Sequence, residues 1–249
     1  MTRFYLTGRV SIEGSSLVDQ AELPGRHGRL ALVRLALARH RPLPTGELAD
    51  AIWGADVPAS VETSLRAVIS KLRSAVARAE ATPSPTIAFD AGCYQLRAPG
   101  AWVDVEAAAN AVDRAEGAWR AGGSEVAWQH ATVAASIARR PLLPGEDAAW
   151  VAEAQGRLRR VHLRAMAVLA EVWRERGDHG LAVATATELV ALEPFREASH
   201  RALILAHQAA GDAAEAARAY EDCRELMREA LGVDPSPETQ RLHRHVLRG

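Results

Sequence analysis

Apolar and polar residues in the first part of the chain follow two different periods. Loose alternation over residues 4–12, interrupted at Gly8, predicts one or two short strands. After a turn at Leu23–Gly25, apolar residues recur at helical spacing, which predicts a helix that ends before Pro42. Thr45 is the predicted N-cap of a second, short helix that runs through Trp53 and closes at Gly54.

A third helix, opened by Pro58 and Ser60, is predicted to be amphipathic. Its apolar side carries Leu65, Val68, Ile69, Leu72 and Val76, and its other side carries Arg66, Ser70, Lys71, Arg73 and Ser74. Side chains three and four positions apart share a helix face, so Arg66, Ser70 and Arg73 lie together with Lys71 beside them. Any solvent-exposed helix in an arginine-rich chain can show a similar face. Whether this face contacts DNA or is an ordinary surface therefore depends on the position of the helix in the fold.

That place is set by a hairpin pattern further along the chain. Apolar residues alternate on both sides of a turn at Asp90–Gly92, which predicts a β-hairpin over residues 87–96. Strands, three helices and a hairpin in this order are typical of a winged helix-turn-helix, whose third helix enters the major groove of DNA while the hairpin reaches an adjacent groove. Residues 1–98 are therefore predicted to form a DNA-binding domain with a small β component.

From residue 103 to residue 249 the pattern is helical. Gly177-Asp178 and Gly211-Asp212 lie 34 residues apart, and a 34-residue period of paired helices is typical of tetratricopeptide (TPR) repeats. A similar repeated feature occurs earlier in the chain, where Gly123 precedes Gly177 by 54 residues. The expected fold class is thus mainly α, with a winged helix followed by a TPR-like α-helical solenoid that offers a surface to a partner.

Charge and composition support two roles on one chain. Residues 1–100 carry 12 basic and 9 acidic residues, a net charge of +3, whereas the remaining 18 and 22 give the rest of the chain −4. A mildly basic first half fits nucleic acid but predicts only modest non-specific affinity. The 48% hydrophobic fraction contains only 5% aromatic residues, so the cores must be aliphatic, which favours packed helices.

Other classes of function lack their sequence signals. The chain has no glycine-rich phosphate loop and no evident catalytic arrangement of Ser, His, Asp or Cys, so we do not expect an enzyme. Cys93 and Cys223 lie far apart, and no Cys/His cluster has zinc-ligand spacing, so neither a disulfide, a metal nor another cofactor is expected. Without a leader or a long apolar run, the expected location is the cytoplasm, away from membranes.

The large aromatic residues and the late histidines are interpreted as structural or ordinary surface residues. Trp53 and Tyr94 are expected to pack within the first domain. Packing anchors of an alanine-rich solenoid are predicted at Trp119, Trp128, Trp150 and Trp173. His243 and His245 have the wrong spacing for a helical metal pair and are expected at the surface.

Taken in order, several motifs resemble the Streptomyces antibiotic regulatory proteins, actinobacterial activators that join an OmpR-type winged helix to a bacterial transcriptional activator domain. In the first half the matching pieces are Glu47-Leu48 through Gly54, Pro58-Ala59-Ser60, Val68 through Arg73, and Gly92 through Leu96. In the second half they are Pro194 through Glu197, His200, Gly211, Ala216, Tyr220, and the most specific piece, Leu231 through Thr239.

The resemblance implies an activator that binds direct repeats in double-stranded DNA near a promoter and recruits RNA polymerase. It further implies regulation of secondary-metabolite genes such as those of antibiotic biosynthesis, and a homodimer that forms in solution or only on DNA. Carried onto this chain, the DNA-binding residues are Thr63, Arg66, Ala67, Ser70, Lys71, Arg73, Ser74 and Arg97. The polymerase-facing loop is Gly54, Ala55, Asp56, Val57 and Pro58.

One departure from the family pattern keeps other hypotheses open. Relatives often carry a basic residue at the turn of the wing, whereas this chain has Asp90, which repels phosphate unless Arg97 substitutes for the missing charge. A second hypothesis is therefore a TPR-type interaction adaptor with a degenerate winged helix, which heparin binding and a salt titration would test. A third is a ligand-sensing regulator, which a thermal-shift screen would test.

Overall fold

The computed structural model describes residues 1–246 as two compact units, each built from two stretches of the chain. The first unit holds residues 1–108 and 137–158, and the second holds residues 109–136 and 159 onward. The predicted domain boundary between residues 98 and 103 therefore does not coincide with the division between the units. Residues 247–249 of the predicted second domain lie outside the described residues.

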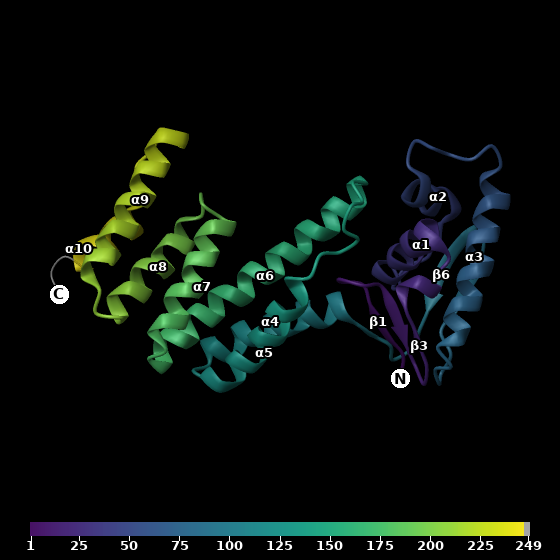
Figure 1. The fold of residues 1–249 in the computed structure, drawn as a ribbon, viewed down its shortest axis with the longest axis horizontal. Coiled ribbons are helices and arrows are strands. Elements are labelled where there is room, and N and C mark those ends of the chain that lie inside the picture. Colours follow the sequence, from purple (N-terminus) through teal and green to yellow (C-terminus); the bar gives the residue numbers. More distant parts are fainter. Residues whose placement is uncertain (247–249) are drawn as a thin grey trace. The chain divides into compact units, whose positions relative to one another are not determined.

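The first unit contains two small sheets and the helices that pack on them. Its complete elements are β1 (Arg3–Tyr5), β2 (Ser11–Glu13), β3 (Leu17–Val18), a 3-10 turn (Gln20–Glu22), α1 (Gly25–Leu37), β4 (Leu43–Pro44), α2 (Thr45–Trp53), α3 (Val61–Arg78), β5 (Thr86–Asp90), β6 (Cys93–Arg97) and β7 (Trp102–Val103). Figure 1 shows α1, α2 and α3 gathered around these strands. The predicted N-terminal strands, three helices and hairpin are all present in this order.

Both sheets are small and have a simple order. In the four-stranded sheet, β3-β2-β1-β7, strand β1 pairs antiparallel with β2 and parallel with β7. In the three-stranded sheet, β4-β6-β5, the hairpin pairs Ile87 with Leu96 and Phe89 with Tyr94. Strand β5 lies at the edge of this sheet. The hairpin formed by β5 and β6, residues 86–97, is the one predicted as the wing and is called the wing below.

The core of the first unit is aliphatic, as the composition predicts. Helix α3 buries Leu65, Ile69, Leu72, Ala75 and Val76. Val68, assigned to the same apolar side, is only half-buried. Burial of such a side chain contributes about 1.5–3 kcal/mol, so this stripe fixes which face of α3 turns outward.

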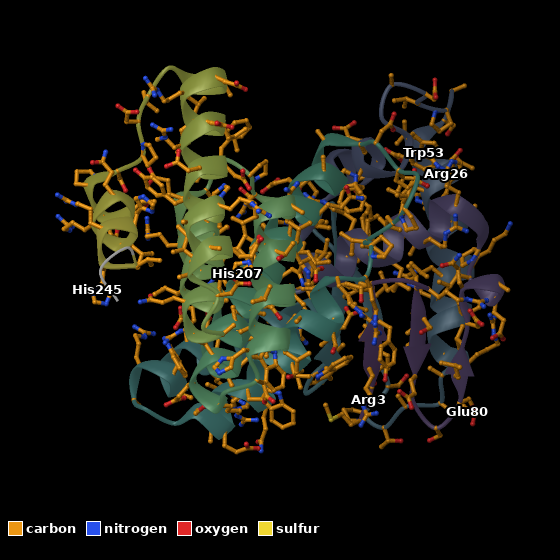
Figure 2. The ribbon with its side chains drawn as sticks, turned by 60° about the vertical axis from the view of Figure 1, so that its left-hand side comes forward. Arg3, Arg26, Trp53, Glu80, His207 and His245 are labelled. Carbon is orange, nitrogen blue, oxygen red and sulfur yellow. The ribbon has the colours of Figure 1, made fainter. Side chains whose placement is uncertain are left out.

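Residues 137–158 complete the first unit. The backbone N–H of Gly8 donates to the carbonyl of Pro141 at 2.7 Å, and Arg26 pairs with Glu146 at 2.5 Å. The Trp150 indole N–H donates to the carbonyl of Ala51 at 3.0 Å, so Trp150 anchors this unit and is not part of the solenoid as predicted. Arg26 and Trp53 are labelled in Figure 2 at the same end of the unit, where His27 contacts the Trp53 ring.

The second unit is helical throughout its described residues. Helices α4 (Asp104–Arg120), α5 (Ser124–Ala138) and α6 (Ala149–Arg176) each contribute most of their length to it. The remaining helices are α7 (His179–Leu192), α8 (Glu197–Ala209), α9 (Ala213–Leu231) and α10 (Pro237–Val246). From α7 onward, each helix packs on the next one in the chain, as the predicted helical repeat requires.

Three turns of the second unit share one geometry, which supports the predicted repeat. Gly122, Gly177 and Gly211 have φ values of 77°, 79° and 78°. The residue after each glycine donates its N–H to the carbonyl five positions earlier, at 2.8–3.0 Å, the C-terminal motif that a left-handed glycine permits. The predicted correspondence of Gly123 with Gly177 is therefore off by one residue, because Gly122 is the glycine that has the conformation of Gly177.

Aromatic side chains support the helices of the second unit. Trp128 and Trp173 meet edge to face with ring centroids 6.3 Å apart, and the Arg176 guanidinium lies over both rings. Trp119 packs against the same alanine-rich core, so three of the four predicted anchors serve this role. His243, expected at the surface, instead stacks on Tyr220 with centroids 3.8 Å apart.

Candidate nucleic-acid interface

Helix α3 presents a face of small and basic residues to solvent. Thr63, Arg66, Ala67, Ser70, Lys71, Arg73 and Ser74 are all exposed, as the alternation with the buried stripe predicts. The helix begins after Ser60, whose hydroxyl donates to Thr63 Oγ1 at 2.9 Å and makes no side-chain cap bond to the backbone. The small side chains at positions 67, 70 and 74 would let another surface approach the helix closely.

Two basic side chains of this face, Arg66 and Lys71, differ in their surroundings. Arg66 pairs with Glu62 at 3.4 Å, but both side chains are more than 70% exposed, so the pair adds little stability and leaves the guanidinium available. Lys71 is exposed and has no ion pair within residues 1–246. Both side chains therefore keep donors free for an anionic partner.

Arg73 makes a contact that the sequence pattern did not predict. Its Nε and Nη2 both donate to the carbonyl of Ile87, at 2.9 and 2.7 Å. That carbonyl belongs to the edge strand β5, so Arg73 ties the wing to α3. These bonds use two of the five donors of the guanidinium, and the reading of bases by Arg73 alongside Arg66 stays a prediction.

We expect Arg73→Ala to loosen the wing without unfolding the unit. Loss of a hydrogen bond from a charged group costs about 1.5–3 kcal/mol, and the Ile87 carbonyl would lose its only side-chain partner described here. Hydrogen exchange of the amides of β5 and β6 should accelerate more than exchange in α1. Arg73→Lys, which keeps one donor, should give an intermediate effect, whereas equal protection in all three proteins would contradict the assigned role.

The tip of the wing is short and firmly attached. Ala91 and Gly92 both have positive φ, at 45° and 76°, the conformation of a two-residue hairpin turn. The carbonyl of Gly92 accepts hydrogen bonds from both the N–H and the hydroxyl of Thr45, at 3.0 and 2.7 Å. Thr45 at the start of α2 therefore pins the tip; Pro44, one residue earlier than predicted, occupies the N-cap position.

The backbone of Arg97 lies away from this tip. The hairpin register pairs Asp90 with Cys93 beside the turn and Thr86 with Arg97 at the opposite end. At roughly 3.3 Å per residue, Arg97 lies about 13 Å along the strand from the turn. Arg97 nevertheless lines the same small pocket as Asp90 and Ala91, so the substitution of Arg97 for a basic residue at the tip stays a prediction.

The loop between α2 and α3 is open to solvent. Gly54, Ala55, Asp56 and Val57 are exposed and Pro58 is half-buried. Gly54 has φ 57° and donates to the carbonyl of Asp50 at 2.8 Å, which ends α2 sharply. Val57 is 49% exposed, an apolar side chain available to a partner of this loop.

Three further structural findings concern metal binding, membrane insertion and cysteine chemistry. No group of three His, Cys, Asp or Glu within residues 1–246 is placed to hold a metal ion. Over the same residues, every helix is too short or too polar to span a lipid bilayer. Cys223 is buried, which raises the pKa of its thiol to about 11 and leaves it protonated near neutral pH.

Sequence reasoning overlooked two residues of this region. Phe89 precedes the turn of the hairpin and is 51% exposed, although it belongs to the apolar alternation of the hairpin. Trp150 was assigned to the wrong unit because its partner, Ala51, lies 99 residues away. The sequence does indicate a break in the helical pattern at this point, because residues 141–147 contain the helix-breaking residues Pro141, Pro144, Gly145 and Asp147.

Comparison with known proteins places the chain in a family. Residues 103–247 match the family model described as the bacterial transcriptional activator domain. The chain belongs to the Streptomyces antibiotic regulatory protein family of transcriptional activators. The resemblance identified from the sequence motifs is thereby confirmed.

Relatives of this family member are longer than the chain. Regulatory protein AfsR of Streptomyces griseus is 30% identical over 99% of this chain and 24% of AfsR. Transcriptional regulatory protein EmbR of Mycobacterium tuberculosis is 26% identical over 88% of this chain and 57% of EmbR. A solved structure of EmbR in complex with a low affinity phosphopeptide has a TM-score of 0.86 at 25% identity, covering 99% of this chain and 65% of that chain. The chain thus spans less than two thirds of each.

Proposed function

We propose that the first unit binds double-stranded DNA through the exposed face of α3. The observation that supports this most directly is two exposed cations on one helix face: Arg66, whose only ion pair is a solvent-exposed one with Glu62, and Lys71, which has none among the described residues. The opposite side of this helix is buried, and its neighbour is a hairpin fixed by Thr45. The small residues Ala67 and Ser70 between them leave space for base edges. Membership in an activator family supports the same conclusion.

The remaining parts of the proposal follow the family. The protein binds direct repeats near a promoter as a homodimer and recruits RNA polymerase through the loop at 54–58. It acts in the cytoplasm and regulates secondary-metabolite genes. Exposed Val57 supports an apolar contact for that loop. The helical second unit supplies the surface for dimerisation.

Selection of bound duplexes from a random pool tests DNA binding without knowledge of the operator. On the selected duplex, Arg66→Ala should cost about 1–3 kcal/mol, because a guanidinium that bonds a guanine discriminates by that amount. Lys71→Ala should weaken binding to every sequence and reduce the salt slope by about 0.9, the share of one phosphate contact.

The matched control is Arg241→Ala, which removes an exposed arginine from α10 in the second unit. Its affinity and salt slope should equal those of the wild type. If both Arg66→Ala and Lys71→Ala bind the selected duplex as well as this control does, α3 is not the reading surface.

The adaptor hypothesis has one specific observation in its favour, the aspartate at the tip of the wing. Asp90 is exposed, and the turn that follows it contains no basic residue. Under this hypothesis the chain would enrich no duplex and would not be retained on heparin even at low salt. Enrichment of a defined sequence decides against it.

A further inference from the structure

A pocket of about 420 Å³ lies over the outward face of the four-stranded sheet in the first unit. The other face of this sheet is buried through Phe4, Ile12 and Val18, so the residues that alternate with them face outward. The pocket is lined by residues of this outward face, of the loop between β1 and β2 and of the segment 137–158, among them Tyr5, Arg9, Ser11, Glu13, Leu17 and Arg140. Volumes of this size are typical of sites for small organic molecules.

Arg140 brings an uncompensated positive charge to the pocket. Its side chain is exposed and makes no ion pair or hydrogen bond within residues 1–246. Its stem lies along Gly8, since a Cβ atom placed on Gly8 would be 3.8 Å from Cδ of Arg140. The N–H of Gly8 donates to the carbonyl of Pro141 at 2.7 Å, and Thr7 forms a β-bridge with Leu142, so the backbone next to Arg140 is attached to the sheet. A guanidinium held at a pocket with its donors unused favours an anionic ligand.

The other charged groups of the pocket already have partners. Glu13 accepts a hydrogen bond from the Tyr5 hydroxyl at 2.7 Å and pairs with Arg3 at 3.6 Å. Arg9 pairs with Asp19 at 3.0 Å. One unpaired positive charge therefore remains in the pocket, which matches the single negative charge of a carboxylate. A phosphate group carries close to two negative charges and would share the pocket with the Glu13 carboxylate, which repels the second one.

The remaining walls of the pocket suit an apolar body. The Tyr5 ring is half-buried and packs on Trp102 with ring centroids 5.3 Å apart, so its position is fixed. Leu17 on the edge strand β3 is 60% exposed. On β2, which lies between β1 and β3, the Ser11 hydroxyl makes no hydrogen bond to any described residue. An aromatic wall with a few free polar groups is typical of a preformed small-molecule site.

We propose that this pocket binds a small organic acid, a carboxylate attached to an aromatic or aliphatic body. The carboxylate pairs with the guanidinium of Arg140, and the body packs on Tyr5 and Leu17. The proposal does not depend on DNA binding. Arg140 belongs to the activator-domain match and Tyr5 to the N-terminal sheet, so the ligand would contact both parts of the sequence within one unit. The stability of the first unit would then depend on the concentration of the acid.

Amide NMR spectra of the isotope-labelled full chain, titrated with benzoate, phenylacetate and hexanoate, test the site directly. At millimolar concentration, at least one of these acids should shift the amide resonances of Thr7, Gly8 and Arg9. Benzamide, phenylacetamide and hexanamide keep the shape of the acids without their charge, and they should bind roughly tenfold more weakly or less. Phenyl phosphate is titrated in parallel to separate a carboxylate from a phosphate ester.

Three variants assign the contacts to particular side chains. Arg140→Gln should weaken binding of the acid roughly tenfold to a hundredfold, the share of a hydrogen bond to a charged group. The matched control is Arg139→Gln, which removes an exposed arginine that does not line the pocket and should leave the affinity unchanged. Leu17→Ser removes part of the apolar wall and should weaken binding by a smaller factor, roughly fivefold. Thermal unfolding of each variant without ligand checks that the first unit stays folded.

Each contrary outcome overturns a stated part of the proposal. If none of the acids shifts these amides, or if the neutral amides bind as well as the acids, the pocket does not recognise a carboxylate. Equal affinity of Arg140→Gln and the wild type would remove Arg140 from the site. Tighter binding of phenyl phosphate than of every acid would replace the carboxylate by a phosphate ester. Since no DNA is present in these titrations, a chain that enriches no duplex could still bind the acid, and the two proposals fail separately.

Discussion

Replacing Asp104 by alanine is expected to destabilise the first unit by about 3–5 kcal/mol, because it leaves several buried donors without a partner. Asp104 is fully buried. Its Oδ2 accepts hydrogen bonds from the N–H of Leu6 at 2.9 Å, the N–H of Thr7 at 2.9 Å and the Thr7 hydroxyl at 2.8 Å. Its Oδ1 accepts from the N–H of Val105 at 2.8 Å. Urea unfolding of the full chain, followed by a probe in this unit, measures the loss.

Graded variants show whether the hydrogen bonds cause the effect. Asp104→Asn keeps one carbonyl oxygen at nearly the same volume and should lose less stability than Asp104→Ala. Thr7→Val removes only the hydroxyl donor and should cost about 1 kcal/mol. A change below about 0.5 kcal/mol for Asp104→Ala would mean that water reaches these donors after the substitution.

The position of Asp104 also explains why the division into two compact units could not be derived from the sequence alone. The residue lies at the start of the activator-domain match, yet its partners Leu6 and Thr7 belong to the N-terminal sheet. Residues 137–158 likewise match the activator domain and pack in the first unit. These contacts join residues roughly a hundred positions apart through single hydrogen bonds, which leave no periodic trace in the sequence.

Periodic features, by contrast, were well predicted. The amphipathic stripe of α3 fixes which of its residues are exposed, and the alternation around Gly92 fixes the hairpin. Gly177 and Gly211 could be recognised as two turns of the same geometry because such a turn depends only on a local positive φ, which glycine adopts without strain, and not on contacts with distant residues. The direction of a long side chain was not predicted, as Arg73 shows: its exposed position on α3 was predicted, but a carbonyl on the neighbouring strand decides where its guanidinium points.

The most specific family motif, at 231–239, meets the motif at 194–197 around one carboxylate in the second unit. Glu197 Oε2 accepts from the N–H and hydroxyl of Ser236, at 2.9 and 2.6 Å, and from the hydroxyl of Thr239 at 2.6 Å. Arg201 donates to Thr239 Oγ1 at 3.1 Å and pairs with Glu238 at 3.3 Å. The motifs therefore encode the docking of α10 on α8, and this structural role accounts for their residue types.

We expect Glu197→Ala to release α10 and to destabilise the second unit by about 2–3 kcal/mol, because the donors of Ser236 and Thr239 lose their acceptor. The wild type should show the same release in acid. Burial, the largest effect, raises the pKa of Glu197, but the hydrogen bonds from Ser236 and Thr239 outweigh it and the net pKa is lowered.

A lowered pKa in the folded state sets the direction of the pH dependence. The carboxylate contributes its full stability above the ordinary glutamate pKa of about 4.3, and this contribution disappears as the pH falls through the lower pKa of the folded protein. Glu197→Gln, which cannot titrate and keeps one acceptor oxygen, should lose stability at neutral pH but less of it on acidification. Hydrogen exchange of α10 amides measured from pH 7 to pH 3, after correction for intrinsic rates, compares the two proteins. Parallel pH profiles would show that another group controls the acid release, because Glu197 is the only carboxylate that the substitution removes.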